Sequence, residues 1–312
     1  MRAFVFPGQG AQALGMGRDL ARAYPSAQAV FDEVDEALGE KLSDVIWGED
    51  LDALTLTQNA QPALMATSLA VMAALKSEGV SVNSVAYVAG HSLGEYSALA
   101  AAGTFSLADT ARLLRKRGAA MQAAVPVGKG AMAAVLGLDF EAVSKVADEA
   151  AQDGVCQVAN ENDPTQNVLS GDLAAVERAV DLAKAAGAKR AIMLPVSAPF
   201  HCALMQPAAE VMAQALDDVM MNVPLVPVVA NVVAEAVSDP VKIRGLLVEQ
   251  VTGQVRWRTS VEWMVANGVS EVWEIGAGKA LSGMIRRINR DVATNAVLSP
   301  DDIATAANAQ NV

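Results

Sequence analysis

Short apolar runs and longer helical segments alternate along the first part of the chain. Residues 4–6 and 85–89 are apolar runs of strand length, and a glycine-containing turn follows each of them. Helical patterning extends through residues 27–38, 62–74 and 107–121. Alternating strands and helices are typical of an α/β domain built on a parallel sheet, and this is the fold class that we expect.

The pattern changes from Gly128 onward. The elements predicted there are a strand at 131–138, a helix at 141–151, strands at 155–159 and 167–170, a helix at 173–186 and a strand at 190–196. The order β-α-β-β-α-β is that of the ferredoxin-like split βαβ unit, for which about 70 residues are enough. We therefore expect residues 128–197 to form an inserted ferredoxin-like (βαββαβ) subdomain. Residues 1–127 and 198–312 are then expected to form one large catalytic domain.

A G-x-S-x-G motif, Gly90-His91-Ser92-Leu93-Gly94, lies between the second predicted strand and an alanine-rich helix. A strand, a sharp turn carrying serine and a helix together describe a nucleophile elbow, which pushes the serine hydroxyl away from the backbone. Ser92 is then the candidate nucleophile, and the amide of Leu93 faces an oxyanion that the helix dipole also favours. The alternative is that Ser92 only caps the helix, because serine is a favoured N-cap.

The chain has two histidines, which narrows the choice of a catalytic base. His91 adjoins Ser92 on the predicted turn, where its ring is badly placed to reach the hydroxyl. His201, which ends the segment Ser197-Ala198-Pro199-Phe200-His201, is therefore the candidate base. In α/β-hydrolases an acidic residue between the serine and the histidine orients the imidazole. No acid in this interval has a local signature, so a carbonyl oxygen is the other candidate for that role.

The charge of the chain argues against a nucleic acid partner. With 35 acidic and 23 basic residues the formal net charge is -12 at pH 7, so phosphates meet no extended basic surface. Basic residues cluster locally at 112–117 and at Arg286, Arg287 and Arg290. Such a cluster is typical of a solvated helix face, and a docking patch is the alternative.

The apolar runs, the first residues and the cysteines of the sequence indicate where the protein is located. No apolar run approaches the roughly 20 residues of a membrane span, and the first residues predict a strand rather than a signal peptide. We therefore expect a cytoplasmic protein that is not bound to a membrane. Cys156 and Cys202 fit a reducing compartment and are interpreted as small buried hydrophobic residues.

The sequence predicts neither a metal nor a cofactor. No histidine or further cysteine lies at metal-ligand spacing from Cys156 or Cys202. A strand predicted at 271–275 precedes Gly276-x-Gly278, but residue 281 is Leu, so the third glycine of a dinucleotide loop is missing. The small, polar residues from Asp301 onward are expected to fray.

Eight motifs between about Arg2 and Ile288 resemble those of malonyl-CoA:acyl carrier protein transacylases, the acyl-loading enzymes of dissociated fatty acid synthesis. They are Gly8-Gln9-Gly10, Gly90-His91-Ser92-Leu93-Gly94-Glu95, Arg117-Gly118, Asn160-Glu161-Asn162, Ser170-Gly171, Pro199-Phe200-His201, Val255-Arg256-Trp257 and Glu274-Ile275-Gly276-Ala277-Gly278. The resemblance implies an α/β-hydrolase-like large domain with a ferredoxin-like insertion, in agreement with the pattern above.

The resemblance also implies a two-stage reaction. Malonyl-CoA would acylate Ser92, and the malonyl group would then pass to the phosphopantetheine thiol of an acyl carrier protein. His201 would act first as base and then as acid, and the amides of Gln9 and Leu93 would form the oxyanion hole. The family orients its histidine with a glutamine main-chain carbonyl, which matches Gln250 here.

The resemblance implies a further role for Arg117, and we expect two more roles, one for Phe200 and one for one of the two basic clusters. Arg117 would hold the malonyl carboxylate, although its basic surroundings are typical of a surface charge. Phe200 would lie beside the substrate α-carbon and favour malonyl over methylmalonyl, partially, because one methylene is worth only about 1–3 kcal/mol. Arg286, Arg287 and Arg290 would form the docking patch for the carrier protein, which is acidic in this pathway.

Three other functions share parts of this pattern. A serine esterase or other hydrolase would use the same elbow but would have no use for Arg117. A trans-acting polyketide acyltransferase would carry almost the same motifs. A non-catalytic interaction protein is the third alternative, and the intact elbow and His201 argue against it.

Overall fold

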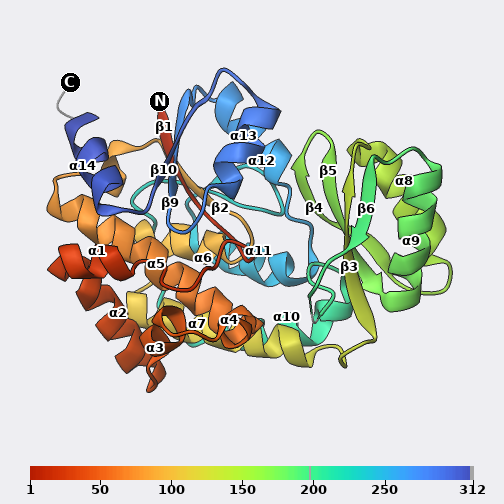
Figure 1. The fold of residues 1–312 in the computed structure, drawn as a ribbon, viewed down its shortest axis with the longest axis horizontal. Helices are drawn as coiled ribbons and strands as arrows, with labels where there is room; N and C mark the ends of the chain where they lie inside the picture. The colour runs from red at the N-terminus through yellow and green to blue at the C-terminus, as the bar shows by residue number, and fades with distance from the viewer. Residues whose placement is uncertain (197, 310–312) are drawn as a thin grey trace.

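Two β-sheets organise the structure, a computed structural model that describes residues 1–196 and 198–309 (Figure 1). The larger sheet is built from the N-terminal and C-terminal parts of the chain, and the smaller sheet from the segment between them. The mixed α/β class predicted from the sequence is confirmed. Ser197, the last residue of the predicted subdomain and the first of the His201 segment, lies outside the described residues.

The larger sheet has the strand order β10-β9-β1-β2-β7-β8 in the described part of the chain. Its strands are β1 (Arg2–Phe6), β2 (Tyr87–Gly90), β7 (Val228–Val229), β8 (Ala236–Val237), β9 (Glu271–Ile275) and β10 (Ala293–Val297). Neighbours from β10 to β7 run parallel, and β8 is antiparallel at one edge. Phe6 lies opposite Gly90, so β1 and β2 end together. Ligands bind outside the carboxyl ends of parallel strands, which makes this end the expected position of a site.

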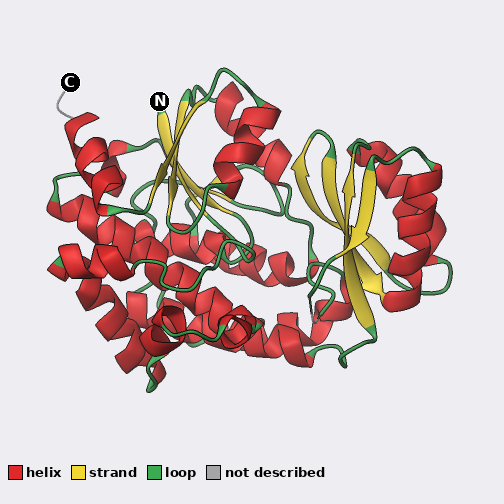
Figure 2. Ribbon diagram, in the orientation of Figure 1, coloured by secondary structure: helices red, strands yellow, loops and turns green. Residues whose placement is uncertain are grey.

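Helices cover both faces of the larger sheet (Figure 2). The helices of this part of the chain, some of which pack on other helices, are α1 (Arg18–Ala23), α2 (Pro25–Leu38), α3 (Leu42–Trp47), α4 (Leu51–Thr55), α5 (Thr57–Ser77), α6 (Gly94–Ala101), α7 (Leu107–Ala123), α10 (Gln206–Asp217), α11 (Pro240–Thr252), α12 (Trp257–Ala266), α13 (Ala280–Ile288) and α14 (Pro300–Ala309). Side chains of β1 alternate between two cores: Phe4 and Phe6 pack in the cluster that includes α5 and α7, whereas Ala3 and Val5 pack in the cluster that includes α12 and α13.

The smaller sheet confirms the predicted β-α-β-β-α-β order. Its elements are β3 (Gly130–Leu136), α8 (Phe140–Ala151), β4 (Cys156–Asp163), β5 (Gln166–Asp172), α9 (Leu173–Ala185) and β6 (Arg190–Met193). All neighbours in the order β4-β5-β3-β6 are antiparallel, and α8 and α9 share one apolar core with the sheet. The predicted last strand ran to residue 196, but β6 ends at Met193 because Pro195 has no N–H to continue the ladder.

Strand β4 attaches the smaller sheet to the large domain. The amide of Glu161 donates to the carbonyl of Val255 at 3.0 Å. The Glu161 carboxylate pairs with Arg258 of α12 at 2.7 Å, and Asp163 pairs with Arg287 of α13 at 2.6 Å. Both carboxylates are buried, and α12 and α13 lie between the two sheets (Figure 1). The two sheets are therefore held in contact by paired charges as well as by backbone hydrogen bonds.

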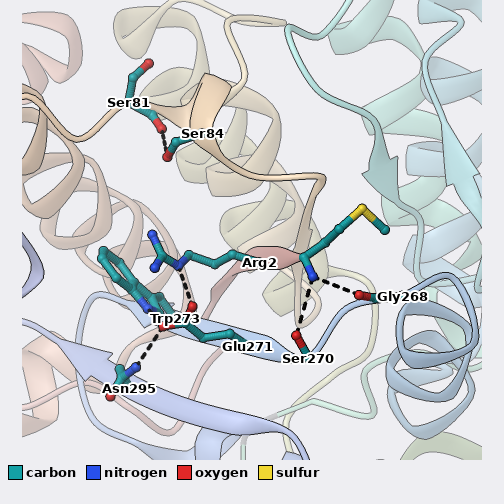
Figure 3. Close-up of polar contacts among 9 residues, drawn as sticks. Arg2, Ser81, Ser84, Gly268, Ser270, Glu271, Trp273 and Asn295 are labelled. Carbon is teal, nitrogen blue, oxygen red and sulfur yellow. Dashed lines mark hydrogen bonds and ion pairs between the residues drawn. The ribbon is translucent and has the colours of Figure 1, made fainter. Parts of the chain in front are cut away.

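Polar contacts fix the first residues of the chain at the amino end of β1 (Figure 3). The α-amino group of Met1 donates to the carbonyl of Gly268 at 2.9 Å. Arg2 pairs with Glu271 at 2.9 Å, and its guanidinium lies 4.0 Å from the centre of the Trp273 ring. These contacts join β1 to β9 at the end of the sheet opposite to Gly90.

The prediction that the chain frays from Asp301 onward was wrong for residues 301–309. Helix α14 spans Pro300–Ala309, and Ile303 and Ala306, one turn apart, are buried against the main core. Residues 310–312 lie outside the described residues.

The exact boundaries of the two domains stay a prediction. None of the described helices is long and apolar enough to cross a membrane.

Candidate active site

The turn after β2 places Ser92 at the carboxyl end of the larger sheet. Strand β2 ends at Gly90 and α6 begins at Gly94, so the predicted strand, turn and helix are all present. Ser92 has a φ of 54°, a left-handed conformation that is uncommon for residues other than glycine. A Cβ on Gly90 would lie 1.9 Å from the Gly94 carbonyl, and a Cβ on Gly94 would lie 2.2 Å from the oxygen of Phe6. The elbow therefore needs both glycines.

The Ser92 hydroxyl lies within hydrogen-bond distance of His201. The distance from Oγ to Nε2 is 2.7 Å. Nδ1 of His201 lies 2.9 Å from the carbonyl oxygen of Gln250 and 3.2 Å from that of Gly253. Carbonyl oxygens only accept hydrogen bonds, so Nδ1 carries the proton and Nε2 is free to accept the serine proton. The geometry matches the carbonyl alternative for the orienting group, and Gly253 is a second carbonyl that the sequence did not indicate.

The environment of His201 keeps its imidazole neutral. Burial, together with the positive charge of Arg117, lowers the pKa of His201 from its ordinary value near 6.5 to about 3, although the carbonyls of Gln250 and Gly253 favour the charged ring. A neutral imidazole is the form that can accept the proton of Ser92. A proton-accepting imidazole is therefore available at Ser92 across the whole neutral and mildly acidic range.

The pH dependence of acylation follows from this shift. We expect the rate of Ser92 acylation by acetyl-CoA, whose acyl group has no carboxylate, to change less than about twofold between pH 8 and pH 5. An imidazole of ordinary pKa would lose about thirtyfold of its neutral form over that range. The rate is measured by quenching the reaction at set times and determining the acylated fraction by intact-mass spectrometry. A decline centred near pH 6.5 would contradict the neutral, buried imidazole.

Arg117 is a buried cation beside Ser92 rather than a surface charge. It lies on α7, and its side chain is 1% exposed. Nη2 lies 3.3 Å from Oγ of Ser92 and donates to Oε1 of Gln250 at 2.9 Å, and Nη1 donates to Oε1 of Gln61 at 2.8 Å. Nε has no hydrogen-bond partner among the described residues. A planar guanidinium in this position can bind a carboxylate on an acyl group attached to Ser92.

A cavity of about 460 Å³ opens onto these residues between the two sheets. Its lining includes all of the predicted site residues except Gln250, namely Gln9, Ser92, Leu93, Arg117, Phe200 and His201, together with Asn160, Asn162, Gln166 and Val168 of the smaller sheet. The amides of Gln9 and Leu93 donate to no other described residue. Gln250 lies behind the cavity, where it contacts His201 and Arg117.

The predicted docking arginines lie outside the cavity but close to it. Leu281 and Met284 of α13 line the cavity, and Arg286 and Arg287 occupy the last turn of the same helix. Arg286, Arg287 and Arg290 are exposed. Arg287 is already paired with the buried Asp163, so its charge is partly compensated.

One polar residue of the site, Asn231, carried no sequence signal, and the role of His91 was not predicted. Asn231 accepts from the amide of Ser92 at 2.8 Å and donates to the carbonyl of Gly90 at 2.7 Å, which holds both ends of the turn. Nε2 of His91 lies 2.9 Å from Oδ1 of Asn162, so His91 links the elbow to the smaller sheet instead of serving Ser92. Nothing in the local sequence around Asn231 distinguishes it from an asparagine in a loop.

The sequence is similar to those of known acyl transferases. Residues 3–244 match the acyl transferase domain family. The malonyl CoA-acyl carrier protein transacylase of Bacillus subtilis is 48% identical over 97% of this chain and 95% of its own length, and that of Escherichia coli K12 is 45% identical over 97% and 98%.

Solved structures extend the likeness to the whole fold. An acyl-carrier-protein S-malonyltransferase from Bartonella henselae is 55% identical, with a TM-score of 0.98 over 100% of this chain and 99% of that one. A malonyl-transacylase in complex with a type II PKS acyl-carrier protein is 42% identical, with a TM-score of 0.96 over 99% of both chains.

Proposed function

The chain belongs to the acyl transferase family, and within it to the malonyl CoA-acyl carrier protein transacylases, and we propose that Ser92 carries the malonyl group in its reaction. The enzyme transfers malonyl from malonyl-CoA to the phosphopantetheine thiol of an acyl carrier protein, for fatty acid synthesis. The observation that carries the proposed residue roles is the buried Arg117 guanidinium 3.3 Å from Oγ of a serine that is hydrogen-bonded to His201.

The first half-reaction uses His201 as a base. As Oγ of Ser92 attacks the thioester carbonyl, its proton passes to Nε2 of His201, which lies 2.7 Å away. The carbonyl oxygen becomes an oxyanion, for which the amides of Gln9 and Leu93 are the donors; such a donor is worth about 3 kcal/mol. The C–S bond then breaks, and the departing sulfur takes the proton from His201.

The second half-reaction runs the same steps in reverse. The phosphopantetheine thiol gives its proton to Nε2 of His201 and attacks the malonyl-serine ester. The C–Oγ bond breaks, and Oγ of Ser92 recovers the proton. One site thus serves two acyl acceptors in turn, which is a ping-pong sequence.

Arg117 supplies the preference for an acyl group that carries a carboxylate. A malonyl carboxylate in this cavity would be a buried charge without a partner if Arg117 were absent. The side chain of Phe200, which is 7% exposed and lines the same cavity, is proposed as the wall beside the α-carbon. An esterase acting on uncharged acyl groups would gain nothing from a buried guanidinium at its nucleophile.

The experiment that tests the proposed function is intact-mass measurement after incubation with malonyl-CoA alone. The protein is expected to gain one malonyl group and to lose it when holo acyl carrier protein is added. Steady release of free coenzyme A without an adduct would mean that water is the acceptor, and a hydrolase would then be the better assignment.

A polyketide role is a second candidate, because one similar structure is a malonyl-transacylase bound to a type II PKS acyl-carrier protein. Both roles use the same chemistry and differ in the carrier that is served. Transfer rates from the malonylated protein to the two kinds of carrier, measured side by side, distinguish them.

We also propose a cytoplasmic location, which is supported by the two free, buried thiols.

The exposed arginines of α13 are proposed as the docking patch for the acidic carrier. Arg286 and Arg287 lie in the last turn of α13, the helix that lines the cavity into which a carrier must insert its phosphopantetheine arm, and Arg290 lies two residues beyond the end of that helix. We expect the double substitution Arg286→Glu and Arg290→Glu to raise the KM for the carrier about tenfold, because charge complementarity governs encounter. Arg287 is left intact, since its reversal would also break the pair with Asp163.

The control for this measurement is Arg22→Glu on α1, an exposed arginine far along the chain from α13. The KM for malonyl-CoA should stay unchanged in both variants. If the double variant has the carrier KM of the unmodified protein, docking lies elsewhere.

A further inference from the structure

A buried carboxylate lies behind the site, and the reaction above does not use it. Glu95 is in the first turn of α6 and is 1% exposed. Its Oε2 accepts from Nε2 of Gln250 at 2.8 Å and from the main-chain amide of Asn231 at 3.0 Å. A buried carboxylate destabilises the folded state unless its oxygens accept hydrogen bonds. The residues that donate to Glu95 are therefore held in place by it.

Three acceptors determine which way the Gln250 amide points: Nε2 donates to the Glu95 carboxylate at 2.8 Å, to the main-chain carbonyl of Ser92 at 3.0 Å and to Oδ1 of Asn231 at 3.3 Å. An ionised carboxylate only accepts hydrogen bonds, so the NH₂ group of Gln250 faces Glu95. The amide oxygen is then turned toward Arg117, whose guanidinium only donates, and Oε1 accepts from Nη2 at 2.9 Å. Gln250 thus lies between acceptors, of which the Glu95 carboxylate is the charged one, and an obligate donor, and both sides fix the same orientation.

The position of Arg117 depends on this orientation. With its amide reversed, Gln250 would present NH₂ to the guanidinium, and two donors would face each other. The same Nη2 that bonds to Gln250 also lies 3.3 Å from Oγ of Ser92. Displacement of Nη2 would therefore move the guanidinium away from the place where an acyl carboxylate on Ser92 must bind.

The base depends on a different part of Gln250. The contact with His201 is made by the main-chain carbonyl of Gln250, whereas the contacts with Glu95 and Arg117 are made by the side chain. Loss of the side-chain contacts leaves the carbonyl in place. Acyl-group selectivity can therefore change while acylation by an uncharged acyl group continues.

We propose that Glu95 is a positioning residue for acyl-group selectivity: it holds the Gln250 amide so that Arg117 faces the carboxylate of the acyl group on Ser92. The proposal rests on the proposed function, because it assumes that Ser92 is acylated and that Arg117 binds the carboxylate. It assigns Glu95 a role that does not require contact with the substrate.

The ionisation of Glu95 sets the conditions of the test. Burial raises the pKa of Glu95 to about 7, while hydrogen bonds from Asn231 and Gln250 and the charge of Arg117 act in the opposite direction. Loading is therefore measured above this value, at a pH of about 8.5, where the carboxylate is mostly ionised.

The experiment compares the rates at which malonyl-CoA and acetyl-CoA load Ser92, read by intact mass. Glu95→Ala removes the charged acceptor of the Gln250 amide and leaves the neutral ones, the Ser92 carbonyl and Asn231 Oδ1. We expect the malonyl-to-acetyl ratio to fall about tenfold, as for loss of one hydrogen bond to a charged group. Glu95→Gln keeps an acceptor oxygen and should retain a ratio within about threefold of the unmodified protein. Asp35→Asn is the control. The Asp35 carboxylate is also buried, but it lies away from the site and accepts hydrogen bonds from Ser43, so its substitution should leave the ratio unchanged.

A double-mutant cycle tests whether the effect passes through Gln250. Gln250→Met removes the amide but keeps the main-chain carbonyl, and should lower the ratio as far as Glu95→Ala does. The double variant should be no worse than Gln250→Met alone, because the two changes remove one and the same arrangement.

Three results would overturn the proposal. They are an equal fall in malonyl and acetyl loading in Glu95→Ala, a fall in Glu95→Gln as large as in Glu95→Ala, and multiplying effects in the double variant. If Glu95→Ala does not fold, an unchanged ratio in Gln250→Met overturns it instead. Ser92→Ala is run alongside: an adduct that persists in this variant refutes the proposed function and not this inference alone.

Discussion

Substitution of Ser92 by alanine is expected to abolish loading by malonyl-CoA, with a fall in rate of at least about 10⁴-fold. In the proposed reaction the Ser92 oxygen is the atom that bonds to the malonyl carbonyl, and His201, 2.7 Å away, has no other proton to remove at this position. Loss of a nucleophile in a serine enzyme leaves only the contribution of binding and of the oxyanion hole, which does not form a covalent adduct. Intact mass after incubation with malonyl-CoA measures the loss directly.

Ser97→Ala is the matched control for this substitution. Ser97 lies on α6 in the same part of the chain, is 0% exposed, and its hydroxyl has no hydrogen-bond partner among the described residues. Its removal should leave loading unchanged. A malonyl adduct on Ser92→Ala that matches the adduct of Ser97→Ala would assign the nucleophile to another residue.

Substitution of Arg117 by methionine is expected to lower malonyl loading by about 10²–10³-fold while acetyl loading persists. Removal of one partner of a buried charge pair costs about 2–5 kcal/mol, because the other charge stays buried without compensation. Arg117→Lys should recover only part of the loss. An ammonium group keeps the charge but cannot make two parallel bonds to a carboxylate while also reaching Gln61 and Gln250.

Arg115→Met on the same helix is the control for Arg117. Arg115 pairs with Glu40 and donates to Asn59, and it does not line the cavity. The ratio of kcat/KM for malonyl-CoA to that for acetyl-CoA is the quantity to measure. An equal loss with both thioesters in Arg117→Met would show that the guanidinium supports the fold of the site and does not select the acyl group.

Local signals in the sequence predicted most of the elements around Ser92. The elbow could be predicted because its requirements are local: a strand, two glycines at fixed spacing and a helix within a few residues. The predicted helix at 107–121 corresponds to α7 (Leu107–Ala123), and the predicted order of the smaller sheet matches the observed one. The short strands β7 and β8 were missed because two residues each are too few to show a pattern.

Charge and burial of single residues were harder to predict. The sequence around Arg117 indicates a solvated helix face, and only the resemblance to a known family indicated otherwise. The structure buries Arg117 because the polar groups that satisfy it, Gln61 and Gln250, come from helices far away along the chain. The C-terminal residues 301–309 were misread for a related reason, since Ile303 and Ala306 are buried by contacts with distant elements.

The sequence by itself determined the class of fold, the position of Ser92 on its turn and the selection of His201, one of two histidines, as the candidate base. The first two follow from patterns that span a few residues, and the third follows from the small number of histidines in the chain. Only the tertiary structure decided the protonation of His201, the approach of Arg117 to Ser92 and the contacts of Glu95 with Gln250 and Asn231. Those properties depend on burial and on hydrogen bonds between residues that are 25 to 155 positions apart, and no local pattern encodes them.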